Sequence, residues 1–291
     1  MEGNRLMATG SNIRTFFNDS WYSEDKFVMR AADHGSWLGT SVFDGARFLE
    51  GVAPDLKAHC ERVNHSAEAM MITPTVSPNE MVDIILEGLK KYNSKEAVYI
   101  RPMYWAIDGG DLAIVPKKGI TGFAICLEDL PMADPNTAAT LTTTSFRRPV
   151  LEDNVVNAKA GCLYPNNARM LAEARAKGFS NALVADVMGN VAETATSNIF
   201  IVKDGEIFTP IPNGTFLAGI TRNRHISNLL AAGHKVHECV LSFQDVHDAD
   251  EVFMSGNMMK VTPVKSFDST NYQIGSITKK VRNLYWEWAH S

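Results

Sequence analysis

Residues 157–167 read NAKAGCLYPNN, and they place a lysine among small residues directly before a helix. Ala158, Ala160 and Gly161 surround Lys159 with little polar surface, a setting compatible with a desolvated amine. Desolvation favours the neutral form of an amine, which can attack an aldehyde carbon. A lysine in this setting is a candidate catalytic lysine, the alternative being a solvated surface lysine.

The chain after this stretch predicts one helix, a run of strands and a second helix. The first helix covers residues 164–177 and ends at Gly178. The strands cover 182–187, 191–195 and 198–210, with an Asp204-Gly205 hairpin turn, and the second helix covers 220–232. Because the strands are joined by short turns, we expect a largely antiparallel sheet.

The chain before this stretch mixes helices and strands. Apolar residues at helical spacing predict helices over 56–70 and 79–92, and short runs rich in β-branched or aromatic residues predict strands at 97–100, 122–126 and 139–146. Residues 127–138 contain two prolines and little periodicity, as an interdomain linker does. The fold class is α/β (α+β), with an N-terminal α+β domain over 1–126 and a mainly β domain over 139–291 that carries the lysine.

Composition excludes several classes of function. The net charge is −5 without a basic run, so we expect no nucleic-acid partner. No segment has the 18 apolar residues of a membrane span, and the N-terminus lacks the apolar core of a secretory signal, so we expect a cytoplasmic protein without a membrane partner. The four cysteines (Cys60, Cys126, Cys162 and Cys239) form no CxxC pair or His/Cys cluster, which argues against disulfides and a metal site.

Four further segments carry motifs that complete the pattern around Lys159. They are GTSVFDGARFLEG at 39–51, VAETATSNIF at 191–200, FLAGITRNR at 216–224 and MSGNMMKVTP at 254–263. With residues 157–167 they resemble the fold-type IV pyridoxal-phosphate aminotransferases, the family of branched-chain and D-amino-acid aminotransferases. The resemblance spans roughly residues 30 to 290 in the family's order. It implies a two-domain enzyme with the active site between the domains.

The resemblance implies that pyridoxal 5′-phosphate is the cofactor and that Lys159 holds it as a Schiff base. Glu193 lies in an otherwise uncharged strand-like run, where a carboxylate is costly unless it is paired. The matching family glutamate pairs with the protonated pyridine nitrogen. Tyr164 resembles the tyrosine that hydrogen-bonds the phenolic oxygen, and Leu217 the residue that packs on the ring; packing alone is the alternative for both.

The phosphate requires hydrogen-bond donors, which the segment LAGITRN can supply. Gly219 allows close approach of the backbone, and the helix that begins near Ile220 points free N–H groups toward an anion. Thr221 can add its hydroxyl. By resemblance, Arg62 and Asn257 also contact the phosphate, and Thr262 is a weaker candidate.

The substrate side resembles branched-chain aminotransferases at Phe43, Gly45, Arg47, Tyr99 and Arg101, with Asn257 and Met258 as further substrate residues. Tyr99 and Arg101 share one face of a strand, because side chains alternate with period two. An arginine there can bind a substrate carboxylate or pair with a protein carboxylate. In the second case Arg47 or Arg148 becomes the candidate carboxylate site.

We expect transamination from a hydrophobic, branched-chain-type L-amino acid to 2-oxoglutarate, both implied by the resemblance. The sequence departs from branched-chain enzymes at Leu38, where they usually carry tyrosine, and at Asn257-Met258, where a Thr-Ala type pair is usual. D-amino-acid transamination, (R)-amine transamination and an aminodeoxychorismate lyase therefore remain alternatives. Family members are typically homodimers or larger, which makes a homodimer the expected assembly.

Overall fold

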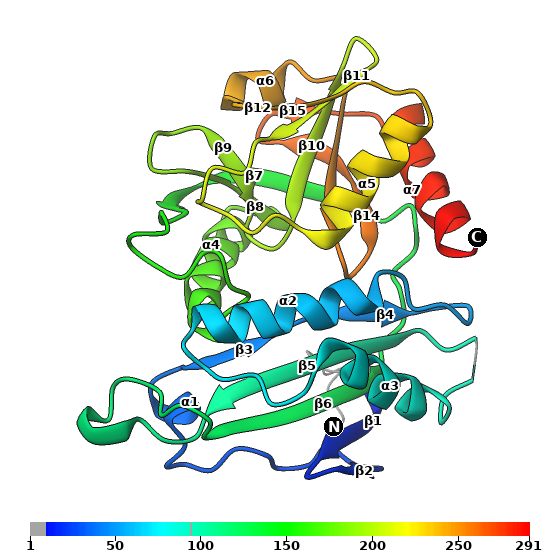
Figure 1. Ribbon diagram of the computed structural model, residues 1–291. Coiled ribbons are helices and arrows are strands. Elements are labelled where there is room, and N and C mark those ends of the chain that lie inside the picture. Colours follow the sequence, from blue (N-terminus) through cyan, green and yellow to red (C-terminus); the bar gives the residue numbers. More distant parts are fainter. Residues whose placement is uncertain (1–9, 94) are drawn as a thin grey trace, which may run out of the picture. The chain divides into compact units, whose positions relative to one another are not determined.

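The computed structural model describes residues 10–93 and 95–291, which form two compact units (Figure 1). Unit 1 contains the described residues up to Met132 together with Ala158–Gly161. Unit 2 contains Ala133–Asn157 and Cys162–Ser291. The short segment with Lys159 thus makes its contacts with unit 1, whereas the sequence assigned it to the C-terminal domain. No helix in the described ranges is long and apolar enough to cross a membrane.

Unit 1 is built on an antiparallel sheet with the strand order β2-β1-β6-β5-β3, in which β4 also pairs with β5. Its strands are β1 (Ser11–Phe17), β2 (Ser20–Tyr22), β3 (Ser41–Phe43), β4 (Ala46–Phe48), β5 (Val98–Ala106) and β6 (Thr121–Asp129). Its helices are α1 (His34–Trp37), α2 (Leu56–Ala69) and α3 (Pro78–Leu89), with a 3₁₀ turn η1 at Gly110–Leu112. Helix α2 packs on β3, β4 and β5, and α3 packs on β6.

Both predicted helices of unit 1 are present, for the reasons that the sequence indicated. Leu56, Cys60 and Val63 form a buried stripe on α2. Ser77 caps α3 by accepting a hydrogen bond of 3.3 Å from the Glu80 N–H, with Pro78 in the first turn.

Strands β5 and β6 are longer than predicted. Strand β5 continues through Pro102, and β6 continues to Asp129, into the expected linker. On one side, β5 pairs with β6 along its full length. On the other side, β3 pairs with residues 103–105 and β4 with residues 98–100, so Arg101 and Pro102 lie opposite the break between them. A proline is tolerated where its missing N–H has no partner strand.

Unit 2 is built on a mixed sheet with the order β12-β11-β10-β13-β14-β7-β8-β9, in which β15 also pairs with β14. Its strands are β7 (Ala139–Arg147), β8 (Asn181–Ala185), β9 (Val191–Thr194), β10 (Asn198–Lys203), β11 (Glu206–Pro210), β12 (Val236–Cys239), β13 (Glu251–Gly256), β14 (Lys260–Phe267) and β15 (Thr270–Asn271). Strand β7 is parallel to β8 and β14, and β11 to β12; the other pairs are antiparallel, so antiparallel pairing predominates as expected.

Helices cover this sheet. They are α4 (Tyr164–Ala176), α5 (Ile220–Ala231), α6 (Phe243–His247) and α7 (Ser276–Ala289), and a 3₁₀ turn η2 (Gly161–Leu163) precedes α4. Helix α4 packs on β7 and β8, and α5 and α7 pack on each other and on β13. The sequence predicted α4 and α5, but it did not predict α7.

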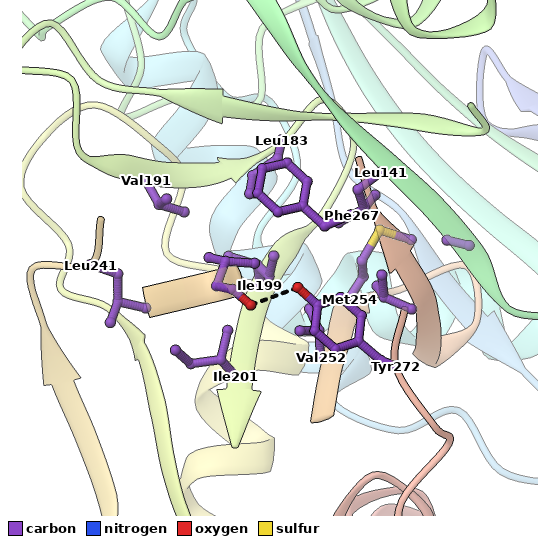
Figure 2. Close-up of a cluster of buried hydrophobic side chains, with 13 residues drawn as sticks. Leu141, Leu183, Val191, Ile199, Ile201, Leu241, Val252, Met254, Phe267 and Tyr272 are labelled. Carbon is purple, nitrogen blue, oxygen red and sulfur yellow. Dashed lines mark hydrogen bonds between the residues drawn. The ribbon is translucent and has the colours of Figure 1, made fainter. Parts of the chain in front are cut away.

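Strand β10 separates two hydrophobic clusters because its side chains alternate. Ile199 and Ile201 belong to the cluster in Figure 2, where the Tyr272 hydroxyl donates a hydrogen bond of 2.6 Å to the Val246 carbonyl. Phe200 belongs to the other cluster, which includes Leu229 of α5 and Val281 of α7. Helices α5 and α7 therefore cover the face of the sheet toward which Phe200 points.

Candidate active site

The backbone of Lys159 is fixed between α2 and β3. Its N–H donates a hydrogen bond of 3.0 Å to Ser66 Oγ, and its carbonyl accepts one of 3.1 Å from the Phe43 N–H. Ala160 forms an isolated bridge with Val42. The Nζ of Lys159 lies 4.6 Å from the centre of the Phe43 ring. The lysine therefore projects from a rigid base and sits against an aromatic face.

The small residues around Lys159 have a packing cause. Ala158 and Ala160 are buried, and a Cβ at Gly161 would come within 2.8 Å of Ser41 Oγ. Larger residues would push the segment away from β3. The small residues that pointed to Lys159 thus allow its backbone to lie against this strand, and the lysine itself is half-buried.

A fully buried aspartate organises the residues next to Phe43. Asp44 Oδ1 lies 2.7 Å from His59 Nδ1 and accepts a hydrogen bond of 2.8 Å from one Nη of Arg62, while Oδ2 accepts one of 2.6 Å from Arg62 Nε. Burial alone would raise the pKa of Asp44, but the charges of Arg62 and His59 hold this pKa well below its usual range. Arg62, the candidate phosphate ligand, thus directs two of its nitrogens at Asp44.

The candidate substrate residues of unit 1 lie side by side on neighbouring strands. Arg47 of β4 is opposite Tyr99 of β5, and Tyr99 is opposite Glu128 of β6. A Cβ at Gly45 would lie 2.2 Å from the Tyr99 hydroxyl, so only glycine leaves room for this ring. Arg101 stacks on Tyr99, with 5.1 Å between the guanidinium carbon and the ring centre.

The two arginines of this group differ in their partners. Arg101 forms an ion pair with the buried carboxylate of Glu128, which also accepts a hydrogen bond of 2.6 Å from the Gly10 N–H. Arg47 is fully buried, and none of its three guanidinium nitrogens has a hydrogen-bond partner among the described residues. Burial lowers the pKa of Arg47 to about 10, against the opposing effects of Tyr99 and Glu128.

In unit 2, the carboxylate of Glu193 is held on both oxygens. Arg148 Nε lies 3.2 Å from Oε1, and Asn198 Nδ2 donates a hydrogen bond of 3.2 Å to Oε2. Arg148 is itself fixed by a hydrogen bond of 2.7 Å to the Thr194 carbonyl and another of 2.7 Å to Asn167 Oδ1. The sequence predicted that Glu193 needs a partner, and Arg148 and Asn198 are the partners.

Asn198 also connects Glu193 to the beginning of α5. Its Nδ2 donates a second hydrogen bond of 3.1 Å to the Leu217 carbonyl, and a Cβ at Gly219 would come within 2.3 Å of its Oδ1. Helix α5 makes its first intrahelical bond from the Asn223 N–H to the Gly219 carbonyl, so the N–H groups of residues 220–222 precede it. Buried Thr221 lies in this first turn. The start of α5 can therefore donate to an anion.

Two further donors lie near the end of β13: Ser255 on the strand itself and Asn257 in the turn that follows it. Ser255 lies directly opposite Asn198 on the neighbouring strand. Neither Ser255 Oγ nor Asn257 Nδ2 has a hydrogen-bond partner in the described part of the chain, although both atoms are buried. Buried polar atoms rarely lack a partner, so these two atoms are available to a ligand. We call Gly219–Thr221, Ser255 and Asn257 the anion cup.

Three candidates are less closely tied to these groups. Tyr164 begins α4 and is 38% exposed, and Met258 is 47% exposed in the β13–β14 turn. Thr262 lies on β14 opposite Met254. Sequence reasoning missed Asp44, His59 and Ser66 in unit 1 and Asn198, Ser255 and Lys260 in unit 2. Four of these residues lie inside the sequence motifs described above, namely Asp44, Asn198, Ser255 and Lys260. Their position in a motif was the signal that could have identified them.

The donor set fits the cofactor that the sequence implied. Pyridoxal phosphate needs a lysine, a group for its ring nitrogen and a phosphate site. Unit 1 provides a lysine whose main chain is fixed, and unit 2 provides an anchored carboxylate beside a helix start with buried donors that lack partners among the described residues. Each unit thus carries groups of the kinds that this cofactor needs.

Comparison with known proteins identifies the family. The family model "Amino-transferase class IV" matches residues 41–267. The chain is similar to a putative branched-chain-amino-acid aminotransferase of Methanocaldococcus jannaschii, with 32% identity over 94% of this chain and 95% of that one. The chain therefore belongs to the class IV aminotransferase family, and the expected fold type, enzyme class and cofactor are confirmed.

Two solved structures are also similar. One is an aminotransferase from Brucella abortus bound to pyridoxal phosphate, with a TM-score of 0.94, 55% identity and coverage of 96% of this chain and 99% of that one. Another is the branched-chain aminotransferase of the archaeon Thermoproteus uzoniensis with norvaline, with a TM-score of 0.88, 26% identity and coverage of 94% of this chain and 93% of that one.

Proposed function

We propose that this aminotransferase moves the amino group of a hydrophobic, branched-chain-type L-amino acid to 2-oxoglutarate. The pair of arginines beside Tyr99 is the observation that supports 2-oxoglutarate as the acceptor. Arg47 is buried without a hydrogen-bond partner among the described residues, and Arg101 is partly exposed. A dicarboxylate offers two anionic groups, and guanidinium groups bind carboxylates through charge-assisted hydrogen bonds. The donor class is supported by the branched-chain names of the M. jannaschii and T. uzoniensis relatives.

Pyridoxal phosphate bound here would supply the electron sink for removal of the Cα proton. Lys159 would hold the cofactor and, once the substrate amine has replaced it, its freed neutral Nζ would take the proton from Cα as a general base. Its main-chain bonds to Ser66 and Phe43 restrict the positions that Nζ can reach. This restriction favours proton transfer, which requires the base within hydrogen-bond distance of the proton.

Glu193 is the proposed partner of the ring nitrogen. The ion pair with Arg148 and the hydrogen bond from Asn198 restrain its carboxylate, so little reorganisation is needed during the reaction. The anion cup, with Arg62 as a further candidate, is the proposed phosphate site. Leu217 and Tyr164 are proposed as contacts of the ring and its phenolic oxygen, and Thr262 as a minor member of the phosphate site.

Phe43, Tyr99, Arg47 and Arg101 are the proposed substrate residues of unit 1, and Asn257 and Met258 those of unit 2. The Phe43 and Tyr99 rings offer apolar surface to a branched side chain. Glu128 fixes Arg101 through one Nη, while the Arg101 side chain stays 27% exposed and keeps donors for a substrate carboxylate. Pairing with Glu128 and binding of substrate are thus compatible.

A half-reaction screen tests this function. The holoenzyme is mixed with L-amino acids, D-amino acids or simple amines, and the loss of cofactor absorbance is followed. We expect leucine, isoleucine and valine in the L form to react fastest, and 2-oxoglutarate to restore the absorbance. A preference for D-amino acids or (R)-amines would replace the proposal by one of these alternatives, and cleavage of aminodeoxychorismate without loss of cofactor absorbance would replace it by the lyase. Leu38 and Asn257-Met258 leave these alternatives open.

A further inference from the structure

Lys260 is a buried lysine that the proposed function does not use. It begins β14, its side chain is fully buried, and its backbone φ is 61°. Lysine is almost never fully buried unless it is paired, and few residues other than glycine adopt this backbone conformation. Two unfavourable features at one position indicate a specific role for the side chain.

The contacts of Lys260 join three elements of unit 2. Its Nζ donates a hydrogen bond of 2.6 Å to Asn257 Oδ1 and lies 5.4 Å from the ring centre of Tyr285 on α7. Its carbonyl oxygen lies 3.1 Å from Nε2 of His225 on α5. The rings of His225 and Tyr285 contact each other edge to face. Lys260 therefore ties the β13–β14 turn to the helix that begins in the anion cup.

The hydrogen bond from Lys260 determines which way the Asn257 amide faces. An ammonium group only donates hydrogen bonds, so its partner must be the amide oxygen. The amide nitrogen then points away from Lys260, and Nδ2 is the buried atom that lacks a partner among the described residues. Without the lysine, rotation of the amide by half a turn would present oxygen, an acceptor, at the same place. Lys260 thus keeps a donor in the cup.

We propose that Lys260 is a positioning residue for the cofactor's phosphate. It fixes the Asn257 amide so that Nδ2 donates to a phosphate oxygen. Ser255 Oγ, on the strand beside Asn198, completes the set of donors with the start of α5. This proposal rests on the assignment of the anion cup to phosphate, and not on the choice of amino donor.

The substrate carboxylate is the other anion that these donors could bind. The start of α5 favours phosphate. Asn198 lies beside Gly219 and opposite Ser255, so the helix N–H groups and the Ser255 hydroxyl flank the same end of β10. Helix N-termini bind phosphate groups through several N–H groups at once.

The test compares pyridoxal phosphate with pyridoxal, which lacks the phosphate. Both are titrated into the full-length chain after removal of its cofactor, and binding is followed by absorbance. For Lys260→Met we expect about a tenfold weaker affinity for pyridoxal phosphate and less than about a twofold change for pyridoxal, as for loss of one charge-assisted hydrogen bond. Methionine keeps an unbranched stem as long as the lysine stem up to Cε, removes the amine and meets the same backbone strain. Lys265→Met, at an exposed lysine of the same strand, is the control and should change neither affinity.

Asn257→Asp provides a second variant in case Lys260→Met folds poorly. Aspartate keeps an oxygen for Lys260, so thermal stability should be retained, but it replaces the Nδ2 donor by a carboxylate oxygen. Affinity for pyridoxal phosphate and for inorganic phosphate should then fall by more than about tenfold, because like charges repel. A role of the Lys260–Asn257 bond in folding alone predicts full affinity in this variant.

Three results would overturn the proposal. The first is an equal loss of affinity for pyridoxal phosphate and for pyridoxal in Lys260→Met, and the second is an unchanged affinity for phosphate in Asn257→Asp. The third is a raised KM for the amino acid with an unchanged affinity for the cofactor. The last result would assign the donor to the substrate carboxylate. A wild-type chain that binds pyridoxal phosphate tightly but rejects branched-chain amino acids would contradict only the proposed function. The two proposals can therefore fail separately.

Discussion

Arg148 and Glu193 form an ion pair with 3.2 Å between Nε and Oε1, and both side chains are nearly buried. Because Arg148 is also bonded to Thr194 and Asn167, this pair belongs to a fixed network, not to a mobile surface contact. Asn198 extends the network to Leu217 at the approach to α5. A change at Glu193 should therefore affect chemistry more than the position of neighbouring residues.

Glu193→Gln should reduce kcat by on the order of 10²-fold, the effect of removing one strong electrostatic stabiliser. Glutamine keeps the shape and can still accept a hydrogen bond from Asn198, but it removes the negative charge proposed for the ring nitrogen. Cofactor affinity should change far less than kcat. Steady-state kinetics and cofactor titration check this. An unchanged kcat would mean that another group protonates the ring.

The purified protein should be yellow, and borohydride should attach the cofactor covalently to Lys159. Lys159→Ala should abolish turnover, because the variant lacks both the attachment point and the proposed base. Mass spectrometry of the labelled peptide locates the modification. Lys177→Ala removes an exposed lysine just after α4 and serves as the control, with full labelling and activity. A label on any other lysine would refute the assignment.

Asp44→Asn should destabilise the protein by about 3–5 kcal/mol near pH 7, the cost of breaking a buried ion pair from one side. Asparagine keeps the shape but leaves Arg62 and His59 without the buried carboxylate. Arg47→Lys is the control, because it keeps a buried charge on the next strand and leaves the Asp44 ion pair intact. A similar loss of stability in this variant would mean that any substitution at the site is destabilising. Denaturant unfolding measures the difference.

The pH dependence of this difference follows from the direction of the pKa shift. Folding holds the pKa of Asp44 well below its usual range, so its stabilising effect is present above the unfolded pKa of about 3.9. The effect is lost as the pH falls from there toward the folded pKa. The difference in the free energy of unfolding between wild type and Asp44→Asn should therefore be constant from about pH 7 to pH 5 and shrink below about pH 4. A gap that grows in acid would contradict the ion-pair explanation.

The sequence predicted the residues whose role is visible in a local motif. Lys159, Glu193 and the start of α5 each lie in a short segment with its own signal, and the structure gives each a fixed environment. Pairs that form between distant segments could not be predicted. Arg148 and Glu193 are 45 positions apart, and Asp44 meets His59 and Arg62 only when α2 packs on β3.

Lys260 illustrates the same limit. A lysine beside a turn is normally solvated, and its burial depends on α5 and α7 covering that end of the sheet. The predicted strand stopped at residue 100, whereas β5 continues through Pro102, because the break between β3 and β4 lies opposite this proline. Local pattern identifies elements and motifs, whereas tertiary packing decides burial and pairing.

Variants of Arg101 and Glu128 can distinguish a role of Arg101 in substrate recognition from a role in protein stability. If Arg101 binds a carboxylate of 2-oxoglutarate, Arg101→Ala should reduce the acceptor's kcat/KM by about 1.5–3 kcal/mol, the value of a hydrogen bond to a charged group. The effect on a monocarboxylate 2-oxo acid should be smaller, because it lacks the second anionic group.

Glu128→Gln is the matched variant, because it removes the ion pair but keeps one oxygen acceptor, which serves either Arg101 or the Gly10 N–H. If Glu128 only orients Arg101, this variant should keep most of the acceptor's kcat/KM, since the guanidinium still attracts a carboxylate. If Arg101 serves only to neutralise buried Glu128, Arg101→Ala should lower thermal stability and leave acceptor kinetics unchanged. The double variant would then regain stability over Arg101→Ala, because no unpaired buried carboxylate remains. In that case the substrate carboxylate should be sought at Arg47, whose guanidinium is buried without a hydrogen-bond partner among the described residues.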